Sequence, residues 1–324
     1  MPFMICRICS AANARALEEV AFFEDFSTTI YDCPACGSRF APSAPDLYES
    51  FHANAAHYYV LRMRAWNARA RALIDQGDTA GLRRAAAGFH FAMPQIIDTL
   101  NMANARSVLE AGCAWGYNGA YFIQTGHDYL GVDISQTAVD QARGTFGDRF
   151  CTVDDPRYAA HTPFDAAFHL GTIGCVEKPI EFTHQILDAV KPGGVLMFNA
   201  PCLEQCAQLD SPWIWGACPP DLVTLFSEDF WHKTFSDVAH VETKLIWSTP
   251  VQSARLRLAR RKSRQPYRGR ILEPVGGHSF AAGSRAKAVL RHVAQVLPVP
   301  FVAPVVNAFG VIVTMTKRPE TCRV

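Results

Sequence analysis

The sequence predicts an α/β protein built on a parallel sheet, with a small cysteine-rich module ahead of it. Two Cys-x-x-Cys pairs near the start, a stretch of helical periodicity after them, and strand patterns alternating with helix patterns from Arg106 onward carry this prediction. Strands that alternate with helices are typical of a parallel sheet with crossover connections. The expected regions are 1–45 for the cysteine module, 46–104 for a helical cover, and 105–324 for the sheet domain with an insertion at about 248–307.

Composition and charge fit a folded chain with a sizeable core. The 324 residues are 49% hydrophobic and 19% charged, and the net charge of +1 gives no overall field that would indicate a nucleic-acid partner. The eleven cysteines are an odd number and no signal-peptide pattern opens the chain, so we expect a cytoplasmic protein with free or metal-bound thiols. Three prolines interrupt the apolar tract 296–316, which favours a buried strand over FGVIVTMT and no membrane span.

Two cysteine pairs predict a structural zinc site. Cys6 and Cys9 form the first pair, Cys33 and Cys36 form the second, and 23 residues separate them, enough for a short hairpin. Four thiolates in two such pairs make a closed tetrahedral site, and metal binding would supply folding energy to a module with so little core. The alternatives are four unrelated buried thiols or a redox pair, and neither pair has the strand–helix surroundings of a redox motif.

The helices and strands follow in order along the chain. A helical pattern runs over 60–76 and stops at Gly77, and a second covers about 80–103 with an interruption at Pro94. Strands are expected near 106–111, 128–133, 149–153, 165–170, 194–199, 239–247 and 308–316. Further helices are expected near 116–125, 135–145, 179–191 and 227–236, with helical character at 281–297 inside the insertion.

The first strand of the sheet domain leads into a glycine turn. Gly112 lets backbone pass close to a ligand, and Gly116 allows a tight entry into the following helix. The dinucleotide fingerprint G-x-G-x-x-G does not fit, because Ala114 stands between these glycines. Asp133 ends the next strand, where a carboxylate can accept hydrogen bonds from both ribose hydroxyls; a helix N-cap role is the alternative.

The ordered set of motifs resembles the class I S-adenosylmethionine-dependent methyltransferases over about residues 85–250. The matching pieces are VLEAGCAWG, GVDIS, VDD, FDAAFHLGTIGCVEKP and LDAVKPGGVLMFNAP. The resemblance implies a Rossmann-like seven-stranded sheet and S-adenosylmethionine as cofactor. It assigns the glycine turn to the methionine part, Asp133 to the ribose, Ile134 to the adenine face, and Asp154 or Asp155 to the adenine amino group. The implied cofactor-binding residues are Glu110, Gly112, Cys113, Ala114, Gly116, Asp133, Ile134, Asp154, Asp155 and Leu170.

The N-terminal module refines this resemblance. A four-cysteine knuckle followed by a segment rich in Tyr and His, residues 48–59, is similar to a bacterial subgroup that acts in sugar, glycan and natural-product pathways. This similarity implies zinc and a small polar methyl acceptor from a sugar, glycan or natural-product pathway. The chain departs from many relatives at Gly174 and Cys175, where they carry Glu-His, so a common active-site histidine is missing.

Methyl transfer needs alignment and exclusion of water more than it needs a general base. His169, at the end of the fourth strand, is the first candidate base, with a structural histidine as the alternative. His278 in the insertion is the second candidate, and Asp221 and Tyr58 are candidates for orienting the substrate. Thiols that could hold a soft metalloid, with core packing as the alternative, follow the fifth strand: Cys202, Cys206 and Cys218.

A basic segment within the insertion leaves the partner open. Residues 251–272 hold eight Arg and Lys side chains and no acidic one, which suits either a phosphate-bearing ligand or a solvated face. An RNA methyltransferase that uses the zinc module and this segment is therefore an alternative function, although the near-neutral total charge speaks against nucleic acid. A non-catalytic cofactor-binding scaffold is a further alternative, and the insertion is also a candidate contact in a homo-oligomer.

Overall fold

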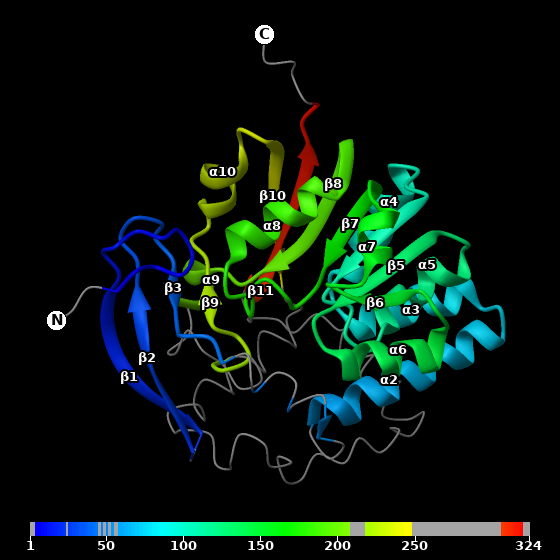
Figure 1. Ribbon diagram of the computed structural model, residues 1–324, viewed down its shortest axis with the longest axis horizontal. Coiled ribbons are helices and arrows are strands. Elements are labelled where there is room, and N and C mark those ends of the chain that lie inside the picture. Colours follow the sequence, from blue (N-terminus) through cyan, green and yellow to red (C-terminus); the bar gives the residue numbers. More distant parts are fainter. Residues whose placement is uncertain are drawn as a thin grey trace, which may run out of the picture.

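The computed structural model describes residues 4–23, 25–44, 58–207, 218–247 and 306–319, together with single positions at 47, 50, 53 and 54. Within these residues the chain forms a seven-stranded mixed sheet covered by helices, as the sequence predicts (Figure 1). The basic segment 251–272, the expected helix at 281–297 and the candidate base His278 lie outside the described residues.

The large sheet has the strand order β10-β11-β8-β7-β4-β5-β6. Its strands are β4 (Ser107–Ala111), β5 (Asp128–Asp133), β6 (Phe150–Thr152), β7 (Phe164–His169), β8 (Val190–Ala200), β10 (Ala239–Trp247) and β11 (Val306–Lys317). The five strands from β4 to β8 run parallel, and β11 pairs antiparallel with both β8 and β10. The chain starts in the middle of the sheet at β4 and then builds outward on both sides, so β4 marks the switch point where open α/β sheets bind ligands.

Helices cover both faces of this sheet and bury two separate hydrophobic clusters against it. One face carries α2 (Tyr58–Asp75), α3 (Thr79–Phe89), α4 (Met93–Met102), α5 (Ala120–Gln124) and α6 (Gln136–Phe146). The other face carries α7 (Pro156–His161), α8 (Pro179–Asp188) and α10 (Phe230–Phe235). Side chains alternate across each strand, so that along β7 Phe168 faces the first cluster and Ala167 the second.

The helices between residues 58 and 102 end or begin close to the glycine and the proline that the sequence analysis singled out. Helix α2 ends at Asp75, and Gly77 follows with a left-handed φ of +67°. Helix α3 ends at Phe89, and Pro94 lies in the first turn of α4, where its missing N–H needs no partner. The sequence did not predict α7, because six residues are too few to show a helical period.

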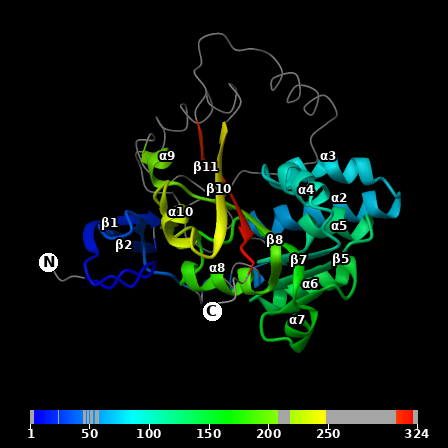
Figure 2. The ribbon, with the colours of Figure 1, turned by 90° about the horizontal axis from the view of Figure 1, so that it is seen from above.

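The cysteine module forms a second, smaller sheet beside α10 (Figure 2). The expected hairpin is present as β1 (Arg15–Phe23) and β2 (Phe26–Asp32), followed by β3 (Arg39–Phe40). The fourth strand, β9 (Thr224–Leu225), comes from the sheet domain and pairs antiparallel with β3. The module therefore shares a sheet with the domain that follows it in the sequence.

None of the helices in the described part is both long and apolar enough to cross a bilayer. The end of the apolar tract 296–316 forms strand β11, as its β-branched composition predicts.

Candidate cofactor site and four-cysteine site

The turn after β4 has three residues in the left-handed conformation, which glycine adopts without strain and alanine does not. Gly112, Ala114 and Gly116 all have left-handed φ angles, of +72°, +47° and +83°. A Cβ on Gly112 would lie 2.5 Å from Thr172 Oγ1, and one on Gly116 would lie 2.6 Å from Phe150 Cε1. These two positions therefore require glycine, whereas Ala114 adopts the strained angle with a side chain in place.

Asp133 fixes this turn against the next strand. Its Oδ2 accepts a hydrogen bond from the Ala114 N–H at 2.8 Å, and its Oδ1 accepts one from the Ser135 N–H at 2.9 Å. The N-cap of α6 is Ser135, whose Oγ accepts from the Ala138 N–H at 3.1 Å. Asp133 therefore anchors the turn and does not cap the helix, and its 2% exposed side chain stands at the carboxyl end of β5.

Glu110 is buried beneath the turn and is held by two groups that the sequence analysis missed. Its Oε2 accepts from the Tyr129 hydroxyl at 2.5 Å, and its Oε1 accepts from Asn118 Nδ2 at 3.2 Å. Burial raises the pKa of Glu110 to about 8, against the effect of these two donors. Glu110 thus ties β4, β5 and the turn together from the inside.

An apolar surface lies exposed next to Asp133. Ile134 is 67% exposed and Val153 is 45% exposed, which is unusual for side chains of this size. Asp133 pairs with Thr152 across the parallel β5 and β6, so Ile134 and Val153 follow at neighbouring strand ends. Asp154 comes next and is exposed. A flat apolar group with a polar edge would fit here, and these are the residues to which the family resemblance assigns the adenine.

Asp155 has a structural task that separates it from Asp154. Its carboxylate caps α7 through the Arg157 N–H and pairs with the Arg157 guanidinium at 2.7 Å, with Arg143 3.5 Å away. The hydrogen bonds from Arg157 lower the pKa of Asp155 to about 2. Of the two acids left open by the sequence, Asp154 is therefore the one whose carboxylate is directed to solvent beside the apolar surface.

Helix α2 closes over the glycine turn. Val60 and Met63 pack with Trp115, and Ala114 lies against the same cluster. Asn67 Nδ2 donates to the Trp115 carbonyl oxygen at 2.9 Å, and the Cys113 side chain is buried beneath the turn. Tyr58 is the first residue of α2, two residues before Val60. Its side chain lies outside the described part.

The ends of β7 and β8 lie at the same edge of the sheet as the ends of β4 and β5. The Gly171 N–H donates to Asn199 Oδ1 at 2.7 Å, and Leu170 is buried on the α2–α6 face. Cys175 Sγ and Asp221 Oδ1 lie 4.0 Å apart, and both residues are half-buried. The structure thus brings the predicted residues Leu170 and Asp221 to the same end of the sheet as Asp133.

His169 lies on the other face of β7. Its ring is fully buried, stacks on Phe198 with centroids 4.5 Å apart, and meets Phe182 edge-on at 5.3 Å. Neither ring nitrogen has a hydrogen-bond partner among the described residues, and burial lowers the pKa of His169 to about 3. A neutral ring packed between aromatic side chains supports the sheet, so the structural alternative fits this geometry better than a general base.

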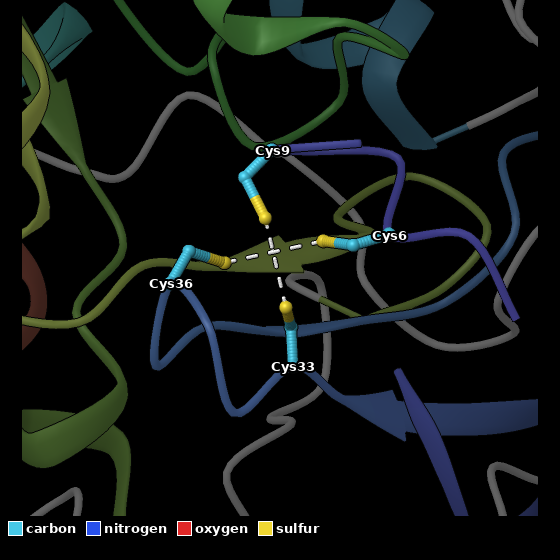
Figure 3. A group of neighbouring side chains, drawn as sticks. All are labelled: Cys6, Cys9, Cys33 and Cys36. Atoms are coloured by element: carbon cyan, nitrogen blue, oxygen red, sulfur yellow. Dashed lines mark hydrogen bonds between the residues drawn. The ribbon is translucent and has the colours of Figure 1, made fainter. Parts of the chain in front are cut away.

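The four cysteines of the N-terminal module point toward one another from two loops (Figure 3). All four sulfurs lie within 4.8 Å of one another, with Cys6 and Cys36 at 3.9 Å and Cys9 and Cys33 at 3.6 Å. Zinc–sulfur bonds of about 2.3 Å in a tetrahedron place sulfurs about 3.8 Å apart, so the cluster matches a structural zinc site. Burial raises the pKa of Cys9 to about 11, a cost to its thiolate that a cation would offset.

The two cysteine loops have the same backbone design. The Ser10 N–H donates to the Cys6 carbonyl oxygen and the Gly37 N–H to that of Cys33, each at 2.8 Å. Ser10 and Gly37 both adopt left-handed φ angles, of +61° and +69°. Both turns therefore place a small residue in the left-handed conformation directly after the second cysteine of the pair.

The later cysteines form no such cluster. Among the described side chains, Cys6, Cys9, Cys33 and Cys36 are the only group of three or more metal-binding residues. Cys202 is buried with its Sγ 3.2 Å from Glu204 Oε2, and Cys218 is buried in a separate apolar cluster. These positions support the packing alternative for Cys202 and Cys218. The side chain of Cys206 lies outside the described part.

Replacing Ala114 with glycine should stabilise the protein. A left-handed φ costs a non-glycine residue roughly 1–2 kcal/mol, and the greater freedom of glycine in the unfolded chain offsets part of the gain. We expect Ala114→Gly to raise the free energy of unfolding by about 0.5–1 kcal/mol in urea unfolding followed by circular dichroism. Ala142→Gly in the middle of α6 is the control and should lower it by about 1 kcal/mol. Equal losses in both variants would show that Ala114 is not strained.

The buried carboxyl of Glu110 should make stability depend on pH. Its pKa rises from 4.5 to about 8 on folding, so between these values the folded chain keeps a proton that the unfolded chain loses. The free energy of unfolding should therefore fall as the pH rises from 4.5 to 8, by at most about 1.4 kcal/mol per pH unit from this group. Glu110→Gln stays neutral and should show a flatter profile in urea unfolding across that range. Parallel profiles for the two proteins would contradict this assignment.

Comparison with known proteins gives a family for the central part of the chain. Residues 109–196 match the family model described as a methyltransferase domain. This range runs from β4 to β8 and contains the glycine turn, Asp133 and Asp154. No curated protein matches the chain.

Several solved structures are similar in fold. The magnesium protoporphyrin IX methyltransferase from Synechocystis PCC 6803 with bound SAH is 17% identical and covers 50% of this chain and 78% of its own, with a TM-score of 0.40. The plantazolicin methyltransferase in complex with a monoazolic substrate analogue and SAH is 11% identical and covers 80% and 98%, with a TM-score of 0.40. The YcgJ protein from Bacillus subtilis is 14% identical and covers 71% and 100%, with a TM-score of 0.43. At these scores the likeness carries no argument about substrate. The family match shows a methyltransferase domain over residues 109–196, within the seven-stranded sheet that carries the glycine turn and next to an N-terminal four-cysteine module.

Proposed function

We propose that this methyltransferase transfers a methyl group from S-adenosylmethionine to a small polar metabolite bound at the ends of β7 and β8. The observation that carries the cofactor part is the arrangement around Asp133. Its carboxylate is fixed by the glycine turn on one side and by the start of α6 on the other, next to an exposed apolar surface. This combination of a fixed acid and an open apolar surface is what a ribose and an adenine require.

Each part of the cofactor has matching residues in this proposal. Asp133 would accept hydrogen bonds from the ribose hydroxyls, Ile134 would pack on the adenine, and Asp154 would accept from the adenine amino group. The turn Gly112–Gly116, with Cys113 and Ala114 contributing backbone, would hold the methionine part. Leu170 would line the same space from β7. Glu110 lies beneath the turn and would support it from within.

The cofactor supplies a methyl group on a positively charged sulfur, which is already a strong electrophile. The protein therefore has to bring the acceptor into line and keep water out, and such alignment can contribute about 7–11 kcal/mol. Closure of α2 over the turn supports exclusion of water on the cofactor side. Asp221, beside Cys175, is the candidate that orients the acceptor or takes its proton, and Tyr58 is the candidate from α2.

The integration of the cysteine module favours a small acceptor over RNA. Strand β3 of the module pairs with β9 of the domain, and Ser227 Oγ donates to the Cys36 carbonyl oxygen at 3.0 Å. A module that shares a sheet with the domain is part of the domain's own structure, whereas a module dedicated to RNA would present a separate surface. We therefore place the acceptor among sugar, glycan or natural-product intermediates, and steep salt-dependent binding to total RNA would instead favour the RNA methyltransferase alternative.

We also propose that the four cysteines hold zinc with a structural role. The sulfur distances fit the ion, and four thiolates leave no position open for a substrate or water. Cys6 and Cys33 belong to the same hydrophobic cluster as β8 and α10, so the bound ion would stabilise the join between module and domain.

Replacing Asp133 should weaken cofactor binding strongly. Asn in place of Asp removes the charge and one acceptor oxygen, and hydrogen bonds to charged groups contribute about 1.5–3 kcal/mol each. We expect Asp133→Asn to reduce affinity for S-adenosylhomocysteine by about 10–100-fold in titration calorimetry. Asp128→Asn, at the opposite end of the same strand, is the matched control and should bind like the wild type. Equal affinity in both variants, or no binding by the wild type, would contradict the proposed cofactor site.

The zinc content of the purified protein should depend on the four cysteines alone. We expect the purified chain to contain zinc by plasma mass spectrometry, and Cys9→Ser to lose most of it and to melt at a lower temperature. Cys151→Ala removes a buried thiol outside the cluster and should keep the full zinc content. Retention of zinc by Cys9→Ser, or its absence from the wild type, would rule out this site.

A further inference from the structure

Arg7 lies between two cysteines of the four-cysteine cluster and reaches into the sheet domain. Its Nη1 donates to the Ala41 carbonyl oxygen at 2.9 Å, within the module. Its Nη2 donates to the Val176 carbonyl oxygen at 2.5 Å, and its Nε donates to that of Glu177 at 3.1 Å. One side chain therefore joins the cysteine loop to a segment about 170 residues later in the chain.

The segment that Arg7 holds is the connection between β7 and α8, residues 170–178. It begins at the carboxyl end of β7, where Thr172 closes against Gly112 of the glycine turn. It continues through Cys175, which faces Asp221, and reaches the two carbonyls bound by Arg7. We call this connection the acceptor segment, because the proposed function places the methyl acceptor at the ends of β7 and β8, where this segment begins.

A second set of contacts ties the same segment to the module. The Gly174 carbonyl oxygen accepts from the N–H groups of Val223 and Thr224, at 2.9 and 3.0 Å. The Val223 carbonyl oxygen accepts in turn from the Ala41 N–H at 2.8 Å. The module thus reaches the acceptor segment by two routes, one through the guanidinium of Arg7 and one through the strand that includes β9.

The two routes differ in what they require. The route through β9 uses backbone groups only and forms with almost any side chains. The route through Arg7 needs a planar cation with several fixed donors, and carbonyl oxygens that converge on it from two parts of the chain. Its position depends on the loop between Cys6 and Cys9, whose shape the four sulfurs set.

We propose that Arg7 is a positioning residue for the acceptor side of the site, and that zinc bound at the four cysteines orders the acceptor segment by fixing Arg7. The term acceptor side rests on the proposed function, but the coupling between the cysteine cluster and residues 170–178 does not. The module then acts on methyl transfer by holding the wall that faces the substrate, without touching the cofactor.

Hydrogen–deuterium exchange of the zinc-loaded full chain tests this directly. The reporters are the Gly171 and Cys175 amides, which bond to Asn199 Oδ1 at 2.7 Å and to the Thr172 carbonyl oxygen at 2.9 Å. Arg7→Met should raise exchange in the acceptor segment about tenfold or more, and Arg7→Lys should restore part of the protection. Arg39→Met is the matched control, because Arg39 belongs to the same module and its guanidinium pairs with Asp32 of that module at 2.7 Å. It should leave exchange in this segment unchanged.

Measurements at the cofactor side distinguish a positioning role of Arg7 from a general loss of stability. Exchange across the glycine turn and affinity for S-adenosylhomocysteine should stay within about threefold of wild type in Arg7→Met. Removing zinc with a chelator should raise exchange in the acceptor segment of the wild type, and add little in Arg7→Met. If Arg7→Met does not fold, the comparison is read from Arg7→Lys, which should lie between wild type and the chelated protein.

Three results would overturn the proposal. They are unchanged exchange in the acceptor segment of the Arg7 variants, an equal rise across the glycine turn, and an additive effect of zinc removal in Arg7→Met. Failure of the wild type to bind S-adenosylhomocysteine would instead overturn the proposed function, and would leave the exchange comparison intact.

Discussion

The carboxylate of Asp133 is the contact on which the cofactor side of the protein depends. It accepts one backbone N–H from Ala114 and one from Ser135, so it fixes the glycine turn and the start of α6 together. With the turn in place, Thr172 packs directly against the backbone of Gly112, and Phe150 packs directly against that of Gly116. The exposed surface at Ile134 then has a defined position relative to the turn. A single carboxylate therefore joins the ends of β4 and β5.

The sequence could predict most of this side because its signals are local. The glycine turn, the acid at the end of β5 and the alternation of strands with helices all lie within residues 107–155, and the structure places them as expected. The cysteine pairs are equally local, since each Cys-x-x-Cys with its small following residue defines its own turn. Boundaries shifted by a few residues, and the short helix α7 that directly follows this stretch was missed.

Other features could not be predicted because they depend on contacts between distant residues. Strand β9 has two residues and no pattern of its own, and it exists through its pairing with β3. His169 was expected at the site because it ends β7, but a side chain's face depends on strand register, and the ring packs against Phe198 and Phe182. The choice between Asp154 and Asp155 was also undecidable, because it depends on the position of Arg157.

This contrast explains why the cofactor can be assigned more readily than the substrate. The cofactor wall is made from one continuous stretch of sequence, so its chemistry can be read from motifs. The proposed acceptor wall depends on contacts among residue 7, residue 41, the connection after β7 and the strand near residue 223. Such a wall can change its shape through any of these parts while the cofactor motifs stay constant. A fold built this way can accept new substrates without disturbing the chemistry that it performs on them.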